Sequence, residues 1–357
     1  MTDILLDARR RPADGSGADF AGLSKRVAAM GLMDRRLGYY IVRIGLVTAF
    51  YAGCWTALVL VGPSWWALAV ATLLGVAFGQ AALVAHDVAH RQVFRGRAAA
   101  DAVGRIAGAA VGMGYAWWQD KHTRHHAHPN HAELDPDVAP DLLLWSADQA
   151  RTARGLPRLL GRVQAFVFFP LLMLEGLNVH VAGFRALANP TLKNRRLEGA
   201  LLAGHLAVYL AALFLVLPPG MAVAFLAVHQ AVFGVYLGLV FAPNHKGMPM
   251  RSGVDHVDFL RRQVLTSRNI RGGRLTDVVM GGLNYQIEHH LFPRMPSPNL
   301  RKVQPIVRDY CHDHGVAYHE TGLIDSYRQA LVSLHQAGAP IRRRPAANAT
   351  SVADGSR

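Results

Sequence analysis

Histidine residues gather in three short clusters along this chain of 357 residues. The clusters read His86-Asp-Val-Ala-His90, His122-Thr-Arg-His125-His126 and Gln286-Ile-Glu-His289-His290. Spacings of three and four residues place the imidazoles of one cluster on one face of a helix. Neutral imidazoles are good ligands for first-row metals such as iron, zinc and copper. The clusters therefore predict a metal site.

The number of histidines favours two metal ions. Seven histidines in the clusters exceed the four ligands of one tetrahedral zinc ion, so two ions sharing the set is the economical interpretation. The chain has no Glu-x-x-His pair, which disfavours a carboxylate-bridged di-iron bundle. Asp87 and Glu288 lie inside clusters, and we expect both to orient imidazoles as hydrogen-bond acceptors.

Two long stretches that contain no Lys, Arg, Asp or Glu must position these clusters. They cover residues 44–85 and 199–245, and each is about twice the ~20 residues that a helix needs to cross a bilayer. Gly62-Pro63-Ser64 interrupts the first near its middle, and Pro218-Pro219-Gly220 interrupts the second. Soluble core helices rarely run uncharged for so long, so we predict two transmembrane hairpins. The expected spans lie near residues 41–62, 65–85, 199–217 and 221–243.

The net charge of +14 marks topology rather than a nucleic-acid partner. Such an excess is typical of proteins that bind nucleic acid or anionic membranes. All Lys and Arg residues lie outside the uncharged stretches, and neither hairpin turn contains one. The positive-inside rule then places both termini, the central segment and the histidine clusters in the cytoplasm. No DNA-binding motif accompanies the charge, so we expect no nucleic-acid partner.

Composition excludes two further classes. A chain that is 51% hydrophobic is not intrinsically disordered, and two cysteines do not make a disulfide scaffold. His205 and His229 lie within the predicted third and fourth spans, where a functional role and a hydrogen bond between helices both remain open.

The clusters and their surroundings resemble the membrane-bound fatty acid desaturases. The residues that carry the resemblance are HDVAH from His86, WWQDKHTRHHAHPN from Trp117 and GGLNYQIEHHLFP from Gly281. It runs from about Tyr39 to Leu334, and the glutamine-headed third box is most like the front-end type. In that family the boxes hold two non-haem iron ions that activate dioxygen as co-substrate. The resemblance implies an enzyme that removes two hydrogens from an unactivated acyl chain.

The resemblance also implies a ligand set. The implied iron ligands are His86, His90, His122, His125, His126, His289 and His290, with His245 as an additional one. Gln286 stands where many relatives have a histidine and is a further candidate. Asn244 is placed to orient His245 or a metal-bound water. Asn130, Asp135 and Asp137 resemble family positions after the second box, with turn formation as the alternative.

Substrate and electron donor follow from the same resemblance. The implied substrate is a fatty acyl chain on coenzyme A, membrane lipid or acyl carrier protein. The haem-binding HPGG motif of a fused cytochrome b5 domain is absent from the sequence, so we expect electrons from NAD(P)H through a separate reductase and a ferredoxin or cytochrome-type donor. A lipid hydroxylase on the same scaffold shares the iron and oxygen chemistry. A membrane metal transporter or sensor is disfavoured, because transporters place ligands near the bilayer midplane.

We therefore predict an all-α integral protein of a bacterial cell membrane. Four transmembrane helices form two hairpins, and a cytoplasmic helical cap carries the di-iron histidine site. Residues 1–38 are expected to form a partly disordered cytoplasmic segment, 39–337 the desaturase domain and 338–357 a disordered tail.

Overall fold

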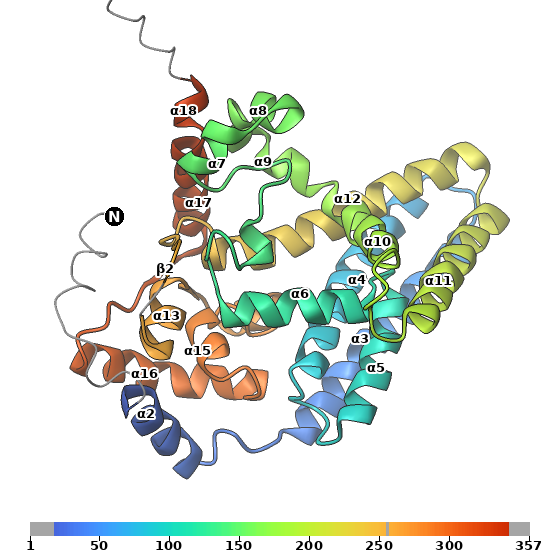
Figure 1. The fold of residues 1–357 in the computed structure, drawn as a ribbon. Helices are drawn as coiled ribbons and strands as arrows, with labels where there is room; N and C mark the ends of the chain where they lie inside the picture. The colour runs from blue at the N-terminus through green and yellow to red at the C-terminus, as the bar shows by residue number, and fades with distance from the viewer. Residues whose placement is uncertain (1–17, 255–256, 343–357) are drawn as a thin grey trace, which may run out of the picture.

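The computed structural model describes residues 18–254 and 257–342, and the described chain is mostly helical (Figure 1). Among the described residues, four helices are long and apolar enough to cross a membrane, which confirms the four expected spans. They are α3 (Leu37–Val61), α4 (Ala67–Ala89), α11 (Arg195–Val216) and α12 (Pro219–His245). Helices α3 and α4 form one hairpin, and α11 and α12 form the other.

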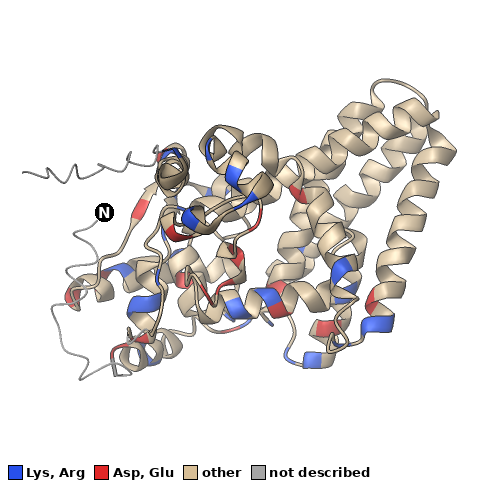
Figure 2. Cartoon of the chain, turned by 45° about the horizontal axis from the view of Figure 1, so that its top comes forward, with Lys and Arg blue, Asp and Glu red and all other residues tan. Residues whose placement is uncertain are grey.

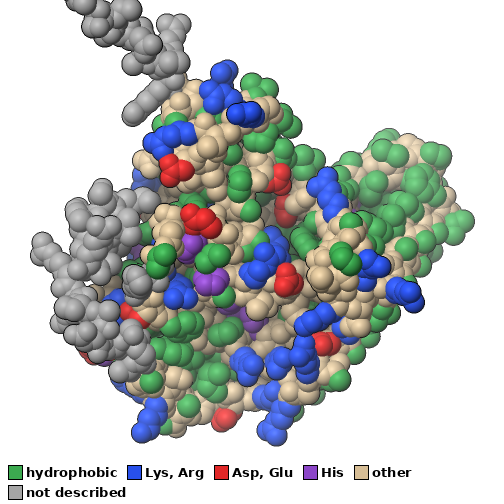
Figure 3. All heavy atoms as spheres, viewed as in Figure 1, with side chains coloured by type: hydrophobic (Ala, Val, Ile, Leu, Met, Phe, Trp, Pro, Cys, Tyr) green, Lys and Arg blue, Asp and Glu red, His purple; other side chains and the backbone are tan. Residues whose placement is uncertain are grey.

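Helices α4 and α12 are the centre of the membrane-spanning part. Two glycines of α4 allow close approach: a Cβ on Gly75 would lie 2.9 Å from Val232 of α12, and one on Gly79 would overlap Tyr236. Phe78 and Phe233 fill the apolar core beside them. The ends of the helices at the hairpin turns carry no Lys, Arg, Asp or Glu, and apolar side chains cover them (Figures 2 and 3).

The segment between the hairpins runs back over the ends of the spans. It contains α5 (Arg97–Ala110), α6 (Tyr115–Ala127), η1 (Pro136–Val138), α7 (Ala147–Thr152), α8 (Gly155–Gly161), α9 (Gln164–Leu172) and α10 (Glu175–Ala186). Helices α9 and α10 meet at a 75° bend, so by length and composition the pair would make a fifth, broken span. Both pack against α12.

The cap has a hydrophobic core of its own. The cap comprises α2 (Ala18–Ala29), α13 (Phe259–Leu265), α14 (Arg274–Val279), α15 (Gln286–Leu291), α16 (Ser297–Asp313), α17 (Leu323–Ala337) and α18 (Ala339–Arg342). The helices that contribute to its core are α2, α13, α15 and α16. Leu23 of α2, Ile287 of α15 and Val303 of α16 are all fully buried in this core. The core fixes α15, which carries the third histidine cluster, against α13 and α16.

One feature departs from the all-α expectation. The short strands β1 (Asn269–Arg271) and β2 (Glu320–Gly322) pair in parallel. The expected terminal segments are only partly described: α2 lies in the first and α18 at the start of the last, while residues 1–17 and 343–357 lie outside the described residues.

Candidate metal site

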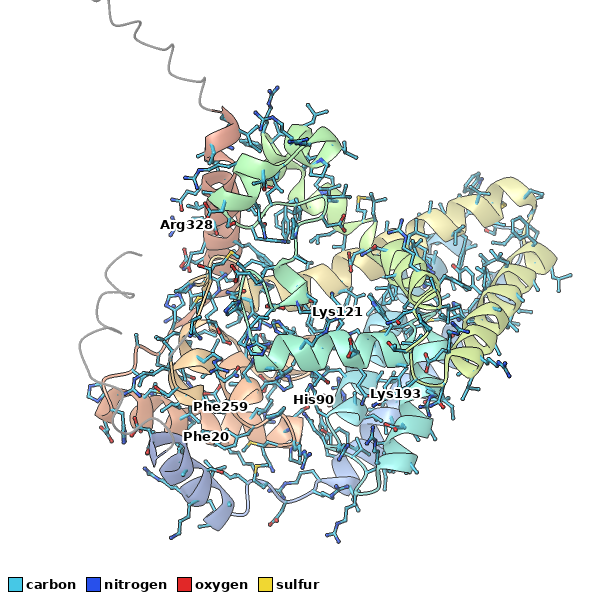
Figure 4. All side chains as sticks on the ribbon, in the orientation of Figure 1. Phe20, His90, Lys121, Lys193, Phe259 and Arg328 are labelled. Carbon is cyan, nitrogen blue, oxygen red and sulfur yellow. The ribbon has the colours of Figure 1, made fainter. Side chains whose placement is uncertain are left out.

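The histidines of the three clusters and His245 come together at one end of the spanning helices. Their possible ligand nitrogens form two groups, each with all its atoms within 4.8 Å of one another. The five-histidine group contains His86, His90, His122, His126 and His289, and the three-histidine group contains His125, His245 and His290. His90, labelled in Figure 4, lies between the cap and the spanning helices.

Four separate elements supply these side chains. The last turns of α4 and α12 bring His86 and His245 to the same end of the two hairpins. Helix α6 crosses that end, and its spacing sends His122 and His126 into one group but His125 into the other. Helix α15 divides its adjacent pair, His289 and His290, in the same way.

Nitrogen atoms in the five-histidine group face one another at close range. The Nε2 atom of His122 lies 2.8 Å from Nε2 of His90 and 3.1 Å from Nε2 of His126. The Nε2 atom of His126 is also 3.2 Å from Nε2 of His289. The Nε2 atom of His86 is buried without a hydrogen-bond partner among the described residues.

In the three-histidine group, outer hydrogen bonds fix the tautomers. His245 Nδ1 lies 3.0 Å from the carbonyl oxygen of Thr266, and His125 Nδ1 lies 3.0 Å from a carboxylate oxygen of Asp135. His290 Nδ1 lies 2.9 Å from Oε1 of Gln263. These oxygens only accept, so each Nδ1 donates and each neutral imidazole keeps a lone pair on Nε2.

Burial keeps most of the imidazoles neutral. The pKa values of His90, His122, His126, His289 and His290 are well below that of an ordinary histidine, because burial and then the neighbouring histidines disfavour the charged form. Burial also acts on His125, but Asp137 and Asp135 outweigh it and raise its pKa.

The geometry fits metal ions. Nε2 of His125 and Nε2 of His245 lie 3.3 Å apart, and both carry lone pairs. Two nitrogens bound to one tetrahedral ion at about 2.1 Å lie about 3.4 Å apart, so an ion between them turns a repulsive contact into coordination. Imidazole-rich sites suit iron, zinc and copper. The two groups are therefore consistent with a centre of two metal ions.

Comparison with known proteins identifies the family. The sequence pattern of the family described as fatty acid desaturase matches residues 63–322, which is most of the chain. The chain belongs to the fatty acid desaturase family. This result confirms the expected family and the enzyme class, a membrane oxidoreductase, and implies a fatty acyl substrate.

Curated desaturases are similar over most of this chain. An acyl-lipid (9-3)-desaturase of Physcomitrium patens is 30% identical over 313 residues, which cover 84% of this chain but only 58% of that protein. Fatty acid desaturase 3 of Homo sapiens is 28% identical over 334 residues, covering 90% of this chain and 72% of the relative. An acyl-lipid 8-desaturase of Rebecca salina is 29% identical over 356 residues, covering 94% and 79%.

Gln286 lies beside the three-histidine group. Its Nε2 is 2.9 Å from Nε2 of His245, and its Oε1 accepts from Nδ2 of Asn244 at 3.1 Å. An amide binds a metal through oxygen and not through its N–H₂ group. In the orientation observed, Gln286 presents nitrogen to the group, and ligation requires the amide to turn end for end.

The surroundings of the site agree with some predictions and correct one. Asp87 Oδ1 lies 3.4 Å from Nδ1 of His86, as expected for an orienting acceptor. Among the described residues, Glu288 forms no hydrogen bond with a histidine of the three clusters. It accepts hydrogen bonds from Asn269 at 2.6 Å and from Tyr318 at 2.8 Å, and so supports the cap. That part of the prediction is wrong, because the helix turns Glu288 away from the histidines beside it.

Two orienting residues were missed from the sequence. Thr266 and Gln263 belong to a segment without a recognisable motif. Gln263 reaches His290 because α13 packs on α15, and Thr266, at the end of α13, reaches His245 of α12. Gln263 also donates to the backbone oxygen of His126 at 2.9 Å, which orients its amide.

Asn130 and Asp135 are candidates from the sequence, and both orient the site. Asn130 donates its backbone N–H to Asp135 and its side-chain N–H to the backbone of His245. The alternative, turn formation, also holds, because Asp135 accepts from the backbone N–H of Asp137 at 2.9 Å.

The intramembrane histidines form contacts between helices. Tyr209 of α11 and Nδ1 of His229 in α12 are 2.7 Å apart, while Nε2 of His205 lies 3.3 Å from Nε2 of His180 in α10. Of the two open interpretations, the interhelical hydrogen bond is the one observed.

Proposed function

We propose that this protein introduces a double bond into a fatty acyl chain at two non-haem iron ions. The overall reaction takes one acyl –CH₂–CH₂– unit, dioxygen, two electrons and two protons to –CH=CH– and two water molecules. Breaking an alkyl C–H bond needs an oxidant that protein side chains do not supply, and bound iron with dioxygen supplies it. The observation that carries this proposal is the convergence of eight imidazoles, five from buried histidines and three from half-buried ones, into two groups.

Each group would hold one iron ion. The proposed ligands are those of the five-histidine and three-histidine groups, with Gln286 as a further candidate. Asp135, Thr266 and Gln263 hold the Nδ1 protons of His125, His245 and His290, so that the Nε2 lone pairs point inward.

Apolar residues next to the site suit an acyl chain. Trp118 stacks on His122 with ring centroids 4.6 Å apart, and it also packs against the core that contains Phe78 and Phe233. Trp118 therefore links the histidines to the apolar core of the membrane-spanning part. An acyl chain held there would be kept from water beside the reacting centre.

A basic pocket of about 1040 Å³ adjoins α6, the helix that carries Trp118. Its cationic lining residues are Arg91, Arg97, Arg105, Arg124, Arg185 and Lys193, and its acidic ones are Asp101 and Asp120. Basic side chains gather on this face in Figure 3, and Lys193 is labelled in Figure 4. Excess positive charge suits phosphate, so we assign the pocket to the phosphate-bearing carrier of the acyl chain.

The proposed topology places the site in the cytoplasm, in line with the positive-inside rule. Electrons would come from NAD(P)H through a reductase and a separate ferredoxin or cytochrome-type protein. The basic face around the site would suit an acidic donor.

The test is expression in a host with a compatible reductase, followed by fatty acid analysis. A new double bond is expected with the unaltered chain and no product with His126→Ala or His290→Ala, while His312→Ala, at an exposed side chain, retains activity. Product in both cluster variants would contradict the ligand assignment. An added oxygen atom without a double bond would identify a hydroxylase instead.

A second test addresses the pocket. Arg185→Gln and Lys193→Gln should raise KM for an acyl-CoA or acyl-phospholipid with little change in kcat, because both residues line the pocket and neither belongs to the histidine groups. Unchanged KM in the double variant would remove the carrier assignment and leave the iron site untouched.

A further inference from the structure

The last turn of α12, which carries His245, is weak by itself. Pro243 lies inside the helix and has no N–H, so the carbonyl oxygen of Leu239 lacks its usual donor four residues later. The final carbonyl groups of any helix also lack donors within the helix. Asn244 and His245 are buried, so water has little access to this turn. The turn therefore depends on donors from other parts of the chain.

Arg268 supplies three of these donors. Its backbone N–H donates to the carbonyl of Asn244 at 3.0 Å, its Nε to that of Pro243 and its Nη2 to that of Lys246. The three carbonyls lie on both sides of His245. The Arg268 side chain is fully buried, the largest such side chain in the part of the chain that the structure describes. Its positive charge lies at the end of α12 where the helix dipole favours a cation.

Helix α17 holds the guanidinium from the other side. Gln329 Oε1 accepts from Nη1 of Arg268 at 2.6 Å, and Gln329 Nε2 donates in turn to Asp325 at 2.8 Å. Burial lowers the pKa of Arg268 to about 10, with Asp325 opposing the shift, so the guanidinium stays charged at neutral pH. Tyr327 of the same helix donates to the carbonyl of Leu239 that the proline leaves free, at 2.5 Å. Thus α17 and the segment before β1 together fix the end of α12.

The same segment also orients the imidazole of His245. Its Nδ1 lies 3.0 Å from the carbonyl oxygen of Thr266, two residues before Arg268. Its Nε2 lies 3.3 Å from Nε2 of His125. One short stretch of chain therefore holds both the backbone and the ring of His245, and a shift of the last turn would break the alignment with His125.

We propose that Arg268 is a positioning residue for the three-histidine group. Its guanidinium holds the backbone on both sides of His245, and Gln329 carries the constraint to α17. Arg268 belongs to neither histidine group and acts through His245. The five-histidine group takes no ligand from α12, so Arg268 acts on one iron ion and not on the other. The inference rests on the proposed function, because it assumes iron at the three-histidine group.

Iron affinity gives the first test, measured by chelator competition on the purified, iron-loaded protein. Arg268→Met should weaken binding at the three-histidine group about 10-fold to 100-fold, the usual cost of losing a group that orients a metal ligand. Arg268→Lys keeps the charge but not the spread of donors, so it should recover part of the affinity. Gln329→Met leaves Nη1 without its acceptor and should give a smaller loss. Affinity at the five-histidine group should not change.

Two controls separate positioning from general destabilisation. Val303→Ala loosens the core of the cap and should keep normal iron affinity at both groups. Arg308→Met removes an arginine that is 51% exposed, and it should also behave like the unaltered chain. If Arg268→Met does not fold, Arg268→Lys and Gln329→Met carry the same test.

Hydrogen exchange gives a readout at the helix end itself. The N–H of Lys246 donates to the carbonyl of Ala242 in the last turn of α12. It should exchange at least about 10-fold faster in Arg268→Met than in His290→Ala, which loses a ligand of the same group but leaves α12 intact. Equal exchange in these two variants, or unchanged iron affinity in a folded Arg268→Met protein, would overturn the proposal. Absence of iron from the unaltered chain would instead contradict the proposed function, and the exchange comparison would still decide the role of Arg268.

Discussion

The two histidine groups should respond differently to the loss of one ligand. His245 is one of three imidazoles in its group, so His245→Ala leaves His125 and His290 there. His90 is one of five, so His90→Ala still leaves four. A metal ion held by four imidazoles has the ligand number of a complete tetrahedral site, whereas one held by two does not.

The magnitude follows from these counts. Changes that only disturb the hydrogen bonding around metal ligands cost about 10-fold to 100-fold in affinity. Loss of one of three direct ligands should therefore lower the affinity at the smaller group by at least about 100-fold. His245→Ala should retain about one iron ion per chain of the two expected, and His90→Ala should retain nearly two.

Iron content measured by mass spectrometry after purification and desalting gives the stoichiometry. His312→Ala is the control, because its side chain is 89% exposed and lies outside both groups. A thermal unfolding curve for each variant checks that the fold persists. Two iron ions in His245→Ala would refute the division of ligands, and so would loss of both ions in a folded His245→Ala protein.

Three further predictions concern the support of the site and the core. Asp135→Asn should weaken iron binding about 10-fold to 100-fold, measured by chelator competition, because the carboxylate orients His125. Gly112→Ala should destabilise the protein by more than about 1 kcal/mol, since φ is +70° and a Cβ would overlap His180; thermal unfolding should show partial recovery with His180→Ala added. Phe78→Ala should cost about 3–5 kcal/mol in the same unfolding assay, because Phe78 is fully buried in the spanning core.

The sequence was sufficient for the spans because their signal is local. Helices α3 and α4 correspond to one uncharged stretch that a Gly-Pro turn divides, and the stretch can be found without tertiary information. The boundaries differ because a helix continues beyond the apolar core: α4 runs on to Ala89 and carries His86 within its last turn. The four-residue spacings likewise predicted that His86 and His90, and His122 and His126, face a common group.

The division of the histidines could not be read from the sequence. His125 and His126 are neighbours on α6 but belong to different groups, and only the approach of α12 and α15 decides this. The role of Thr266 could not be predicted either, because it acts through its backbone carbonyl, which every residue has. The pairing of β1 with β2 joins segments on either side of α16. Strands of three residues are too short to show an alternating pattern, so the pairing could not be predicted from the sequence.

The site also joins two parts of the molecule that have separate hydrophobic clusters. Helices α4 and α12 are fixed by apolar packing in the spanning part, whereas α15 belongs to the core of the cap. Without an ion, the facing lone pairs of His125 on α6 and His245 on α12 oppose their contact. The third member of their group, His290, lies on α15, so an ion bound by all three joins the cap to the spanning part. Because the site does not exist in the unfolded chain, the free energy of metal binding adds to the free energy of folding. Metal loading should therefore stabilise the contact between cap and spans more than either part alone, and the cap should be the first element to loosen when iron is removed.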